Sequence, residues 1–296
     1  MGNVYVGVRN IARKVQKAYI GVSNKARKVQ KAYIGVSNKA RLVYQAEKME
    51  FTEAEVNELI VYGKINQVPI GSTFTIANSQ DTSRSVHTYV VIGKDHKDLN
   101  VTNYPSAKAA TGTVDVWGTG AIAKRFFKST SPYGYWNASD IRTWLNNTFY
   151  NGFNSTTKVH LKQMTVEYYY TTNTGNSTTM IAPGNFNTTD YVKLLSSREF
   201  NPSTYITGKY YMHMREGNGY EYFPSVAHDS QTSDGKKRFA SATGTAGVDF
   251  QWRRSLHCFS SDSGNAVWQV TSNGNLASDS RGNGTYGIVP CFRLGA

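Results

Sequence analysis

The residues that most often do chemistry occur in this sequence in no catalytic order. Histidine occurs six times, and no pair shows HExxH or another spacing typical of a metal site. A nucleophile elbow, a phosphate-binding loop and a dinucleotide-binding glycine motif are all absent from the sequence. The sequence therefore predicts a protein that is not an enzyme, with no catalytic residue, no metal ligand and no cofactor. The histidines are His87, His96, His160, His213, His228 and His257.

The cysteines and carboxylates give no stronger indication of a catalytic or metal-binding site than the histidines do. Two cysteines, Cys258 and Cys291, are too few for a disulfide framework or a four-cysteine zinc site. Cys291 lies in an apolar segment, which favours a small buried residue, while a disulfide with Cys258 stays open. Loop carboxylates have no spacing that selects a pair for glycoside hydrolysis, and their order is not that of an EF-hand. The sequence therefore gives no support for a calcium site and does not exclude one.

The positive charge is concentrated in one short segment. The chain of 296 residues has a formal net charge of +13, but residues 1–46 hold ten Lys and Arg and no Asp or Glu. The other 250 residues carry 23 basic and 20 acidic residues, a net charge of only +3. The basic residues recur with a sequence repeat and match no nucleic-acid-binding motif. We therefore expect no nucleic-acid partner, and the lack of a long apolar run predicts no membrane insertion.

That basic segment consists of three copies of one unit of 14 residues. Residues 5–18, 19–32 and 33–46 read YVGVRNIARKVQKA, YIGVSNKARKVQKA and YIGVSNKARLVYQA. An Asn at each centre and a tendency of apolar residues to alternate predict a β-meander over residues 1–46. So small a meander has little core, so we expect it to attach or trimerise the protein; the alternative is a basic linker without structure.

The remaining residues form a short connector and a large body. In residues 47–61, Thr52 and Glu55 have the spacing of a helix capping box, which predicts a short helical connector. Residues 62–296 read as short strands separated by Asn, Ser, Thr and Gly, the clearest at residues 72–76, 87–92, 191–195 and 266–270. One helix is predicted after Ser139, with Ile141, Trp144, Leu145 and Phe149 on its buried side. The expected fold class is α+β, rich in strands and loops and with few helices.

An ordered set of motifs in the body resembles a known domain. The motifs are Trp136–Asn146 with Thr148-Phe-Tyr, Lys193–Ser196, Arg238–Ala240, Trp252–Ser255, Val267–Val270, Gly274 and Gly287–Leu294. In this order they resemble a domain of unknown function widespread in prophages and bacteria. The family is similar to C-type-lectin-like proteins, including formylglycine-generating enzymes and the variable proteins of diversity-generating retroelements. Leu256 stands where the family usually has Pro, which affects the local loop.

This resemblance implies a ligand-binding face near the C-terminal end of the sequence. In the related variable proteins, ligand contacts come from two stretches that correspond here to residues 257–265 and 277–286. Both stretches are rich in aromatic, Ser, Gly, Asn and Arg residues, a composition typical of evolved binding surfaces. The expected contact residues are His257, Phe259, Ser261, Asp279, Arg281, Asn283 and Tyr286.

Repeats of the form YIGVxxxARKVKKA also occur in tail and structural proteins of phages and prophages. Together the resemblances imply a tail-tip or tail-fibre protein that is made in the bacterial cytoplasm and becomes part of the virion. Its expected partners are a host-surface protein or glycan and other tail proteins, with a homotrimer as the oligomeric state. The alternatives are a structural tail or baseplate subunit and an oxidase of the formylglycine-generating type.

Overall fold

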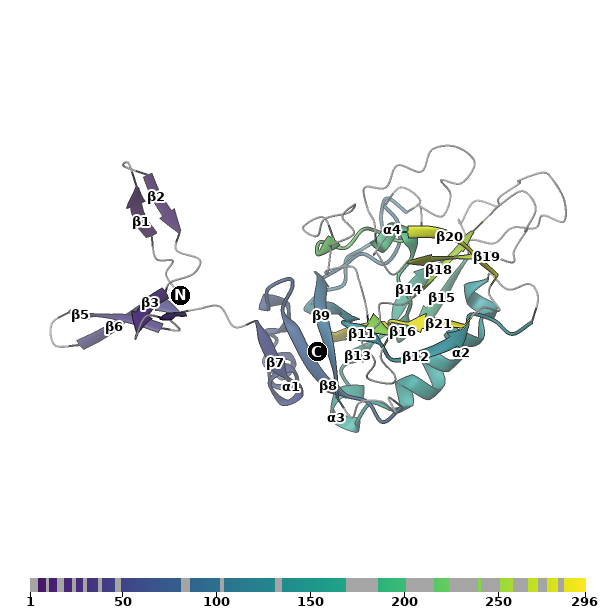
Figure 1. The fold of residues 1–296 in the computed structure, drawn as a ribbon, viewed down its shortest axis with the longest axis horizontal. Helices are drawn as coiled ribbons and strands as arrows, with labels where there is room; N and C mark the ends of the chain where they lie inside the picture. The colour runs from purple at the N-terminus through teal and green to yellow at the C-terminus, as the bar shows by residue number, and fades with distance from the viewer. Residues whose placement is uncertain are drawn as a thin grey trace. The chain divides into compact units, whose positions relative to one another are not determined.

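A computed structural model gives the fold in two compact units, Met1–Met49 and Glu50–Ala296 (Figure 1). Each unit is a separate body of the chain and has its own strands. The structure describes residues 5–8, 11–14, 19–22, 25–28, 31–36, 39–45, 49–80, 86–101, 104–130, 135–168, 186–200, 216–223, 239–240, 251–257, 266–270, 276–281 and 285–296.

The first unit contains one β-hairpin per repeat. The hairpins are β1 (Tyr5–Val8) with β2 (Ile11–Lys14), β3 (Tyr19–Val22) with β4 (Lys25–Lys28), and β5 (Lys31–Val36) with β6 (Lys39–Gln45). Among these strands no ladder joins one hairpin to the next, so the expected meander takes the form of three successive two-stranded sheets. Asn10, Asn24 and Asn38, the expected turn residues, lie outside the described residues.

The second unit is built on a mixed sheet of seven strands. Six of them follow the order β13 (Leu161–Lys162), β22 (Cys291–Gly295), β10 (Thr113–Gly118), β9 (Val86–Lys94), β8 (Thr73–Ala77) and β7 (Glu50–Thr52). The seventh, β16 (Val192–Lys193), also pairs with β22. Only β7 and β8 run parallel among the pairs of this sheet that the structure describes.

Further strands form a five-stranded sheet and two small ones. The larger sheet has the order β12 (Ala123–Phe126), β21 (Thr285–Ile288), β18 (Gln251–His257), β19 (Ala266–Val270) and β20 (Leu276–Arg281). The small sheets pair β14 (Met164–Glu167) with β15 (Asn187–Asp190), and β11 (Gly120–Ala121) with β17 (Phe239–Ala240).

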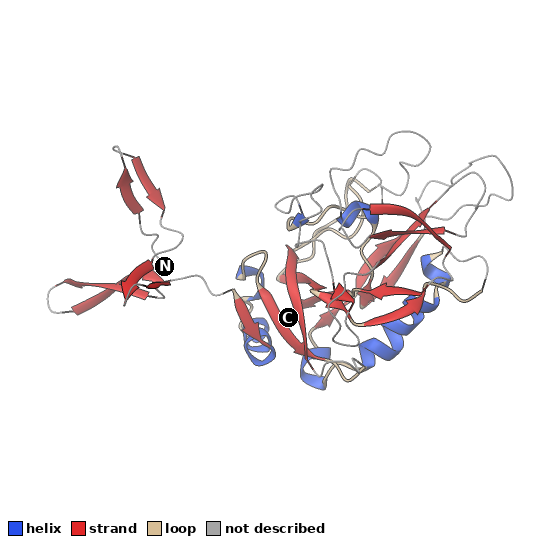
Figure 2. Cartoon of the chain, in the orientation of Figure 1, coloured by secondary structure: helices blue, strands red, loops and turns tan. Residues whose placement is uncertain are grey.

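The helices are short and lie around the strands (Figure 2). They are α1 (Glu53–Val61), α2 (Asp140–Trp144), α3 (Ser155–Lys158) and α4 (Ser197–Phe200), with 3-10 turns at Ile65–Gln67 and Trp136–Ala138 and a π-helical turn at Leu145–Phe149. The expected α+β class, rich in strands and with few helices, is therefore confirmed. No helix in the described part of the chain has the length and hydropathy needed to span a membrane.

The predicted helix caps form as expected. The Thr52 hydroxyl accepts the amide of Glu55, and the Glu55 carboxylate accepts the amide of Thr52 at 2.9 Å, which completes the capping box of α1. The Ser139 hydroxyl accepts the amide of Arg142 at 3.1 Å and begins α2. Ile141, Leu145 and Phe149 are buried, as predicted.

The segment assigned to a connector contributes to the body. Strand β7 extends the large sheet, and Val56 and Ile60 of α1 are buried in its core. The carboxylate of Glu53 accepts the amide of Ala77 on β8 at 3.2 Å and bonds to Asn154 and Thr157 at the start of α3. The second unit therefore begins at Glu50, twelve residues before the expected boundary at 62.

The seven-stranded sheet is buried on both faces. Tyr89 and Val91 of β9 belong to one core, while Val90 and Ile92 of the same strand belong to a second. A strand buried on both sides reads as a continuous apolar run, as residues 89–92 do. The second core also contains Trp117, Tyr220 and Cys291, and it surrounds the charged residues described below.

Candidate functional site

The register of the five-stranded sheet brings together two of the predicted ligand-binding residues. Ala266 of β19 pairs with His257, the last residue of β18, and also with Arg281, the last residue of β20. His257 and Arg281 therefore lie in one row across three strands, on either side of Ala266. His257 is the first residue of the expected contact stretch 257–265. Arg281 lies within the expected stretch 277–286, of which residues 277–281 belong to β20 and residues 285–286 to β21.

The other predicted contact residues are placed differently. Asp279 lies on β20, two residues before Arg281. Tyr286 lies on β21, where it pairs with Arg125 and packs half-buried against the main core. Its neighbour Gly287 pairs with Gln251, the first residue of β18, so Tyr286 is near the opposite end of that strand from His257. Phe259, Ser261 and Asn283 lie outside the described residues.

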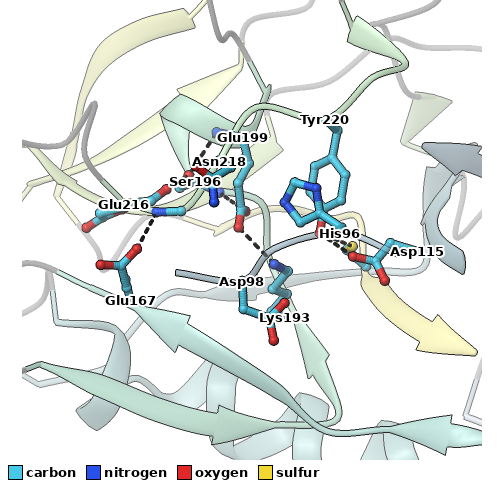
Figure 3. Close-up of polar contacts among 12 residues, drawn as sticks. His96, Asp98, Asp115, Glu167, Lys193, Ser196, Glu199, Glu216, Asn218 and Tyr220 are labelled. Atoms are coloured by element: carbon cyan, nitrogen blue, oxygen red, sulfur yellow. Dashed lines mark hydrogen bonds and ion pairs between the residues drawn. The ribbon is translucent and has the colours of Figure 1, made fainter. Parts of the chain in front are cut away.

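A network of buried polar residues lies on the second core's side of the large sheet (Figure 3). At its centre, the Arg293 guanidinium on β22 donates to both oxygens of Asp115 on β10, at 2.6 and 2.8 Å. It also donates to both oxygens of Asp98, at 2.7 and 3.1 Å. Bidentate pairs of this kind hold two segments in a fixed geometry.

This ion pair is stable because the two charges compensate each other. Burial alone would raise the pKa of Asp115, but the charge and hydrogen bonds of Arg293 lower it below its ordinary value. Burial alone would lower the pKa of Arg293, and the carboxylates of Asp115 and Asp98 raise it. Both groups are therefore charged at neutral pH although Asp115 is fully buried.

His96 and Tyr220 stack beside this ion pair. Their ring centroids are 3.9 Å apart with an angle of 20° between the planes, and the Tyr220 hydroxyl donates to Asp115 at 2.8 Å. Burial raises the pKa of Tyr220 well above its ordinary value, and the Asp115 carboxylate adds to the effect. Burial lowers the pKa of His96 to about 4, so its imidazole is neutral at physiological pH.

A second buried ion pair joins β16 to α4. The Lys193 ammonium donates to Glu199 at 2.8 Å, and both side chains are fully buried. Ser196 and Glu199 cap α4, since the Glu199 carboxylate accepts the Ser196 amide at 2.9 Å and the Ser196 hydroxyl accepts the Glu199 amide at 3.0 Å. The Ser196 hydroxyl also donates to the Glu216 carbonyl at 2.6 Å, which ties the helix to residues 216–220.

Two further residues connect residues 97–101 with residues 216–220. The buried Glu167 carboxylate accepts the amides of Asn100 at 2.6 Å and Gly217 at 2.9 Å. The Asn218 side chain donates to the carbonyls of Lys97 and Leu99, at 2.9 and 2.6 Å. The network thus joins places that are far apart in the sequence: residues 96–101, Asp115, Glu167, residues 193–199, residues 216–220 and Arg293.

The network is suited to holding segments of the body together. Its carboxylates are occupied by the Arg, Lys, Tyr and backbone N–H donors given above. No group of three or more His, Cys, Asp or Glu among the described residues is arranged to hold a metal ion. The hydrogen bonds of the network fix residues 97–101 and residues 216–220 against each other.

Cys291 on β22 is a free thiol, and it is fully buried as predicted. Its sulfur lies 4.0 Å from the Tyr220 hydroxyl, and burial raises its pKa. Metal ions bind the thiolate, which these buried surroundings disfavour. The free thiol also gives no support to a disulfide with Cys258, which lies outside the described residues.

A comparison with known protein families finds a match over most of the body. A family model for a domain of unknown function, DUF6273, matches residues 119–296, which is more than half of the chain. The chain belongs to DUF6273. No curated protein and no solved structure matches the chain.

The DUF6273 region contains the row of His257 and Arg281 and most of the polar network. Lys193, Glu199 and Arg293 lie within it, whereas His96, Asp98 and Asp115 precede residue 119. Lys193 therefore finds its counter-charge inside the region, whereas Arg293 takes its counter-charges from residues before it. Strands β8, β9 and β10 complete the domain around the family region.

Sequence reasoning missed the residues of this network. Three of the four charged members of the two ion pairs at its centre each interrupt an otherwise apolar strand: Asp115 in TVDVWG, Lys193 in VK before two leucines, and Arg293 in CFRLG. A single charge in a buried strand needs an opposite charge nearby, so these interruptions are the signal that could have identified the network.

Proposed function

We propose that this chain is a phage tail-tip or tail-fibre protein that binds a protein or glycan on the host surface without chemical turnover. The observation that supports the proposal is the row of His257, Ala266 and Arg281, because it brings together one residue from each of the two stretches expected to contact ligand. A rigid sheet with contact residues at the ends of its strands is how many binding proteins present variable loops.

The division into two units supports the same proposal. The body has a formal charge of only about +3 on 250 residues, which does not favour phosphate-driven binding there. The repeats form a separate unit that attaches the body to other tail proteins or brings three copies together. Several copies on one virion would raise the effective concentration of weak sites.

Cell adsorption tests the proposed binding face. Fluorescently labelled full-length protein is incubated with the bacterium that carries the gene, and bound protein is measured by flow cytometry. We expect a variant with His257→Ala and Arg281→Ala to lose at least about tenfold in bound protein, as expected when two central contacts are removed.

The matched control removes the same residue types elsewhere in the body, with His160→Ala and Arg125→Ala. It should adsorb as the wild type does. Unchanged adsorption of the His257 and Arg281 variant would refute the binding face, and no adsorption of any variant would favour a structural tail or baseplate subunit.

A further inference from the structure

The three hairpins of the first unit place arginine at the same position in each repeat. Val6 pairs with Arg13, Ile20 with Arg27, and Ile34 with Arg41. Residues directly opposite each other in an antiparallel pair share a face of the sheet. Each hairpin therefore has one face, the isoleucine–arginine face, on which a β-branched residue lies opposite an arginine.

The opposite face of each hairpin has a different composition. Tyr5 and Tyr19 pair with Lys14 and Lys28, and Tyr33 pairs with Leu42. Lys31 is two residues before Tyr33 on the same strand and so shares this face, the tyrosine face. Lys25 and Lys39 lie opposite Val22 and Val36 on the isoleucine–arginine face. The two faces thus differ in number and kind of basic residues, which makes them separable by substitution.

Each hairpin also has strand edges that its own ladder does not use. Every one of the six strands is in a sheet of two, so within the described residues each strand pairs on one side only. A two-stranded sheet is marginally stable in water, and its edges present N–H donors and C=O acceptors to an added strand. The hairpins are therefore suited to a partner that adds strands.

The charge of the segment decides what kind of partner fits. Ten basic residues and no acidic residue occur in residues 1–46. Packing identical copies would place like charges together, which is unfavourable, whereas a strand with Asp or Glu would form opposite-charge pairs across the ladder. Nucleic-acid phosphates supply only acceptors, so they would leave the strand carbonyls unpaired.

We propose that the hairpins bind an acidic protein, whose strands add to the hairpin edges and whose carboxylates pair with the isoleucine–arginine face. This refines the attachment role in the proposed function, favouring a different protein over further copies of this chain. It is independent of the ligand proposed for the body, because a body variant at His257 and Arg281 leaves the hairpins intact.

Binding of fluorescent poly-L-glutamate to the full-length protein tests the inference. One variant carries Arg13→Gln, Arg27→Gln and Arg41→Gln on the isoleucine–arginine face. The matched control carries Lys14→Gln, Lys28→Gln and Lys31→Gln on the tyrosine face, so the two variants lose the same charge from the same segment. We expect the arginine variant to bind about tenfold more weakly and the lysine variant to stay within about threefold of wild type.

Equal weakening of both variants would overturn the proposal, because net charge alone would then explain binding. Tighter binding of duplex DNA than of poly-L-glutamate at physiological ionic strength would overturn the protein partner in favour of nucleic acid. No binding of poly-L-glutamate by the wild type would also overturn it. An unchanged thermal midpoint of the body in both variants verifies that the fold is intact.

Discussion

At the scale of single residues, the body depends on charges that are buried and compensated. Arg293 satisfies two carboxylates at once, and the Tyr220 hydroxyl donates to one of them. Removing one partner of such a pair leaves an isolated charge in the core, which costs more than the pair itself contributes. The main effect of the network is therefore to specify one arrangement of its segments, and its net contribution to the free energy of folding is smaller.

His96 makes the stability of the body depend on pH. Its pKa is about 4 in the folded protein and 6.5 as an ordinary value, because burial disfavours the imidazolium. The unfolded chain therefore binds more protons, and stability falls as pH falls from 6.5 to 4. We expect His96 to lower the free energy of unfolding by roughly 3 kcal/mol as the pH falls from 7.5 to 4.

Urea unfolding at the two pH values measures this effect. The substitution His96→Phe keeps an aromatic ring beside Tyr220 but removes the titrating group. The free energy of unfolding of this variant should therefore fall by roughly 3 kcal/mol less than that of the wild type between pH 7.5 and 4. A control with His160→Gln retains His96 and should keep the wild-type decrease. Identical pH dependence in all three proteins would show that His96 is not the responsible group.

At the scale of elements, close approach of backbone segments shapes the network. Gly217 has φ +77°, and a Cβ there would lie 2.6 Å from Oε1 of Glu199, the oxygen that binds Lys193. Its own amide and carbonyl bond to Glu167 and Asn100. Residues 216–220 can therefore lie against α4 only if this residue has no side chain.

Gly217→Ala should destabilise the body by two separate effects. Positive φ costs an alanine about 1–2 kcal/mol, and the overlap with Glu199 adds about 1–3 kcal/mol. Gly63→Ala is a matched control, since Gly63 also has positive φ, at +62°, but its Cβ would meet nothing within 4 Å. Urea unfolding should give a loss at least about 1 kcal/mol larger for Gly217→Ala; equal losses would contradict the clash.

Local elements were predictable from the sequence where local signals determine them. The capping box of Thr52 and Glu55 and the cap of Ser139 are set by residues three apart, and both form as expected. The strand predicted over residues 191–195 is shorter, at Val192–Lys193, because the Asn146 side chain accepts the amides of Tyr191 and Val192. The sequence could not show which charged residues of the network pair with each other, since Asp115 and Arg293 are 178 residues apart.

At the scale of the whole molecule, the proposed roles of assembly and recognition belong to two separate units. The first unit carries the repeated charges, and the second carries the row of His257 and Arg281. The boundary between them lies before β7, because Phe51 packs edge-on against Phe74 at 5.7 Å and α1 fills part of the main core.

Two shortened chains test this boundary. A chain that begins at Met49 should unfold within about 2 °C of the full-length protein, because both core clusters of the described residues lie in the second unit. A chain that begins at Tyr62 loses the half-buried Phe51 and the buried Val56 and Ile60, worth roughly 5 kcal/mol, which is comparable to the stability of a typical domain. We expect it to lack a cooperative thermal transition by circular dichroism; a normal transition would place the boundary after α1.

The position of β22 in the large sheet has a consequence for synthesis of the protein. This strand pairs with β10, β13 and β16, yet it is the last strand of the fold to leave the ribosome. At a synthesis rate of about 5–20 residues per second, Arg293 is added roughly 10–40 s after Asp115, the residue whose charge it neutralises. During that time β10 lacks its partner strand β22 and Asp115 lacks Arg293, while each hairpin of the repeats can close as soon as it emerges.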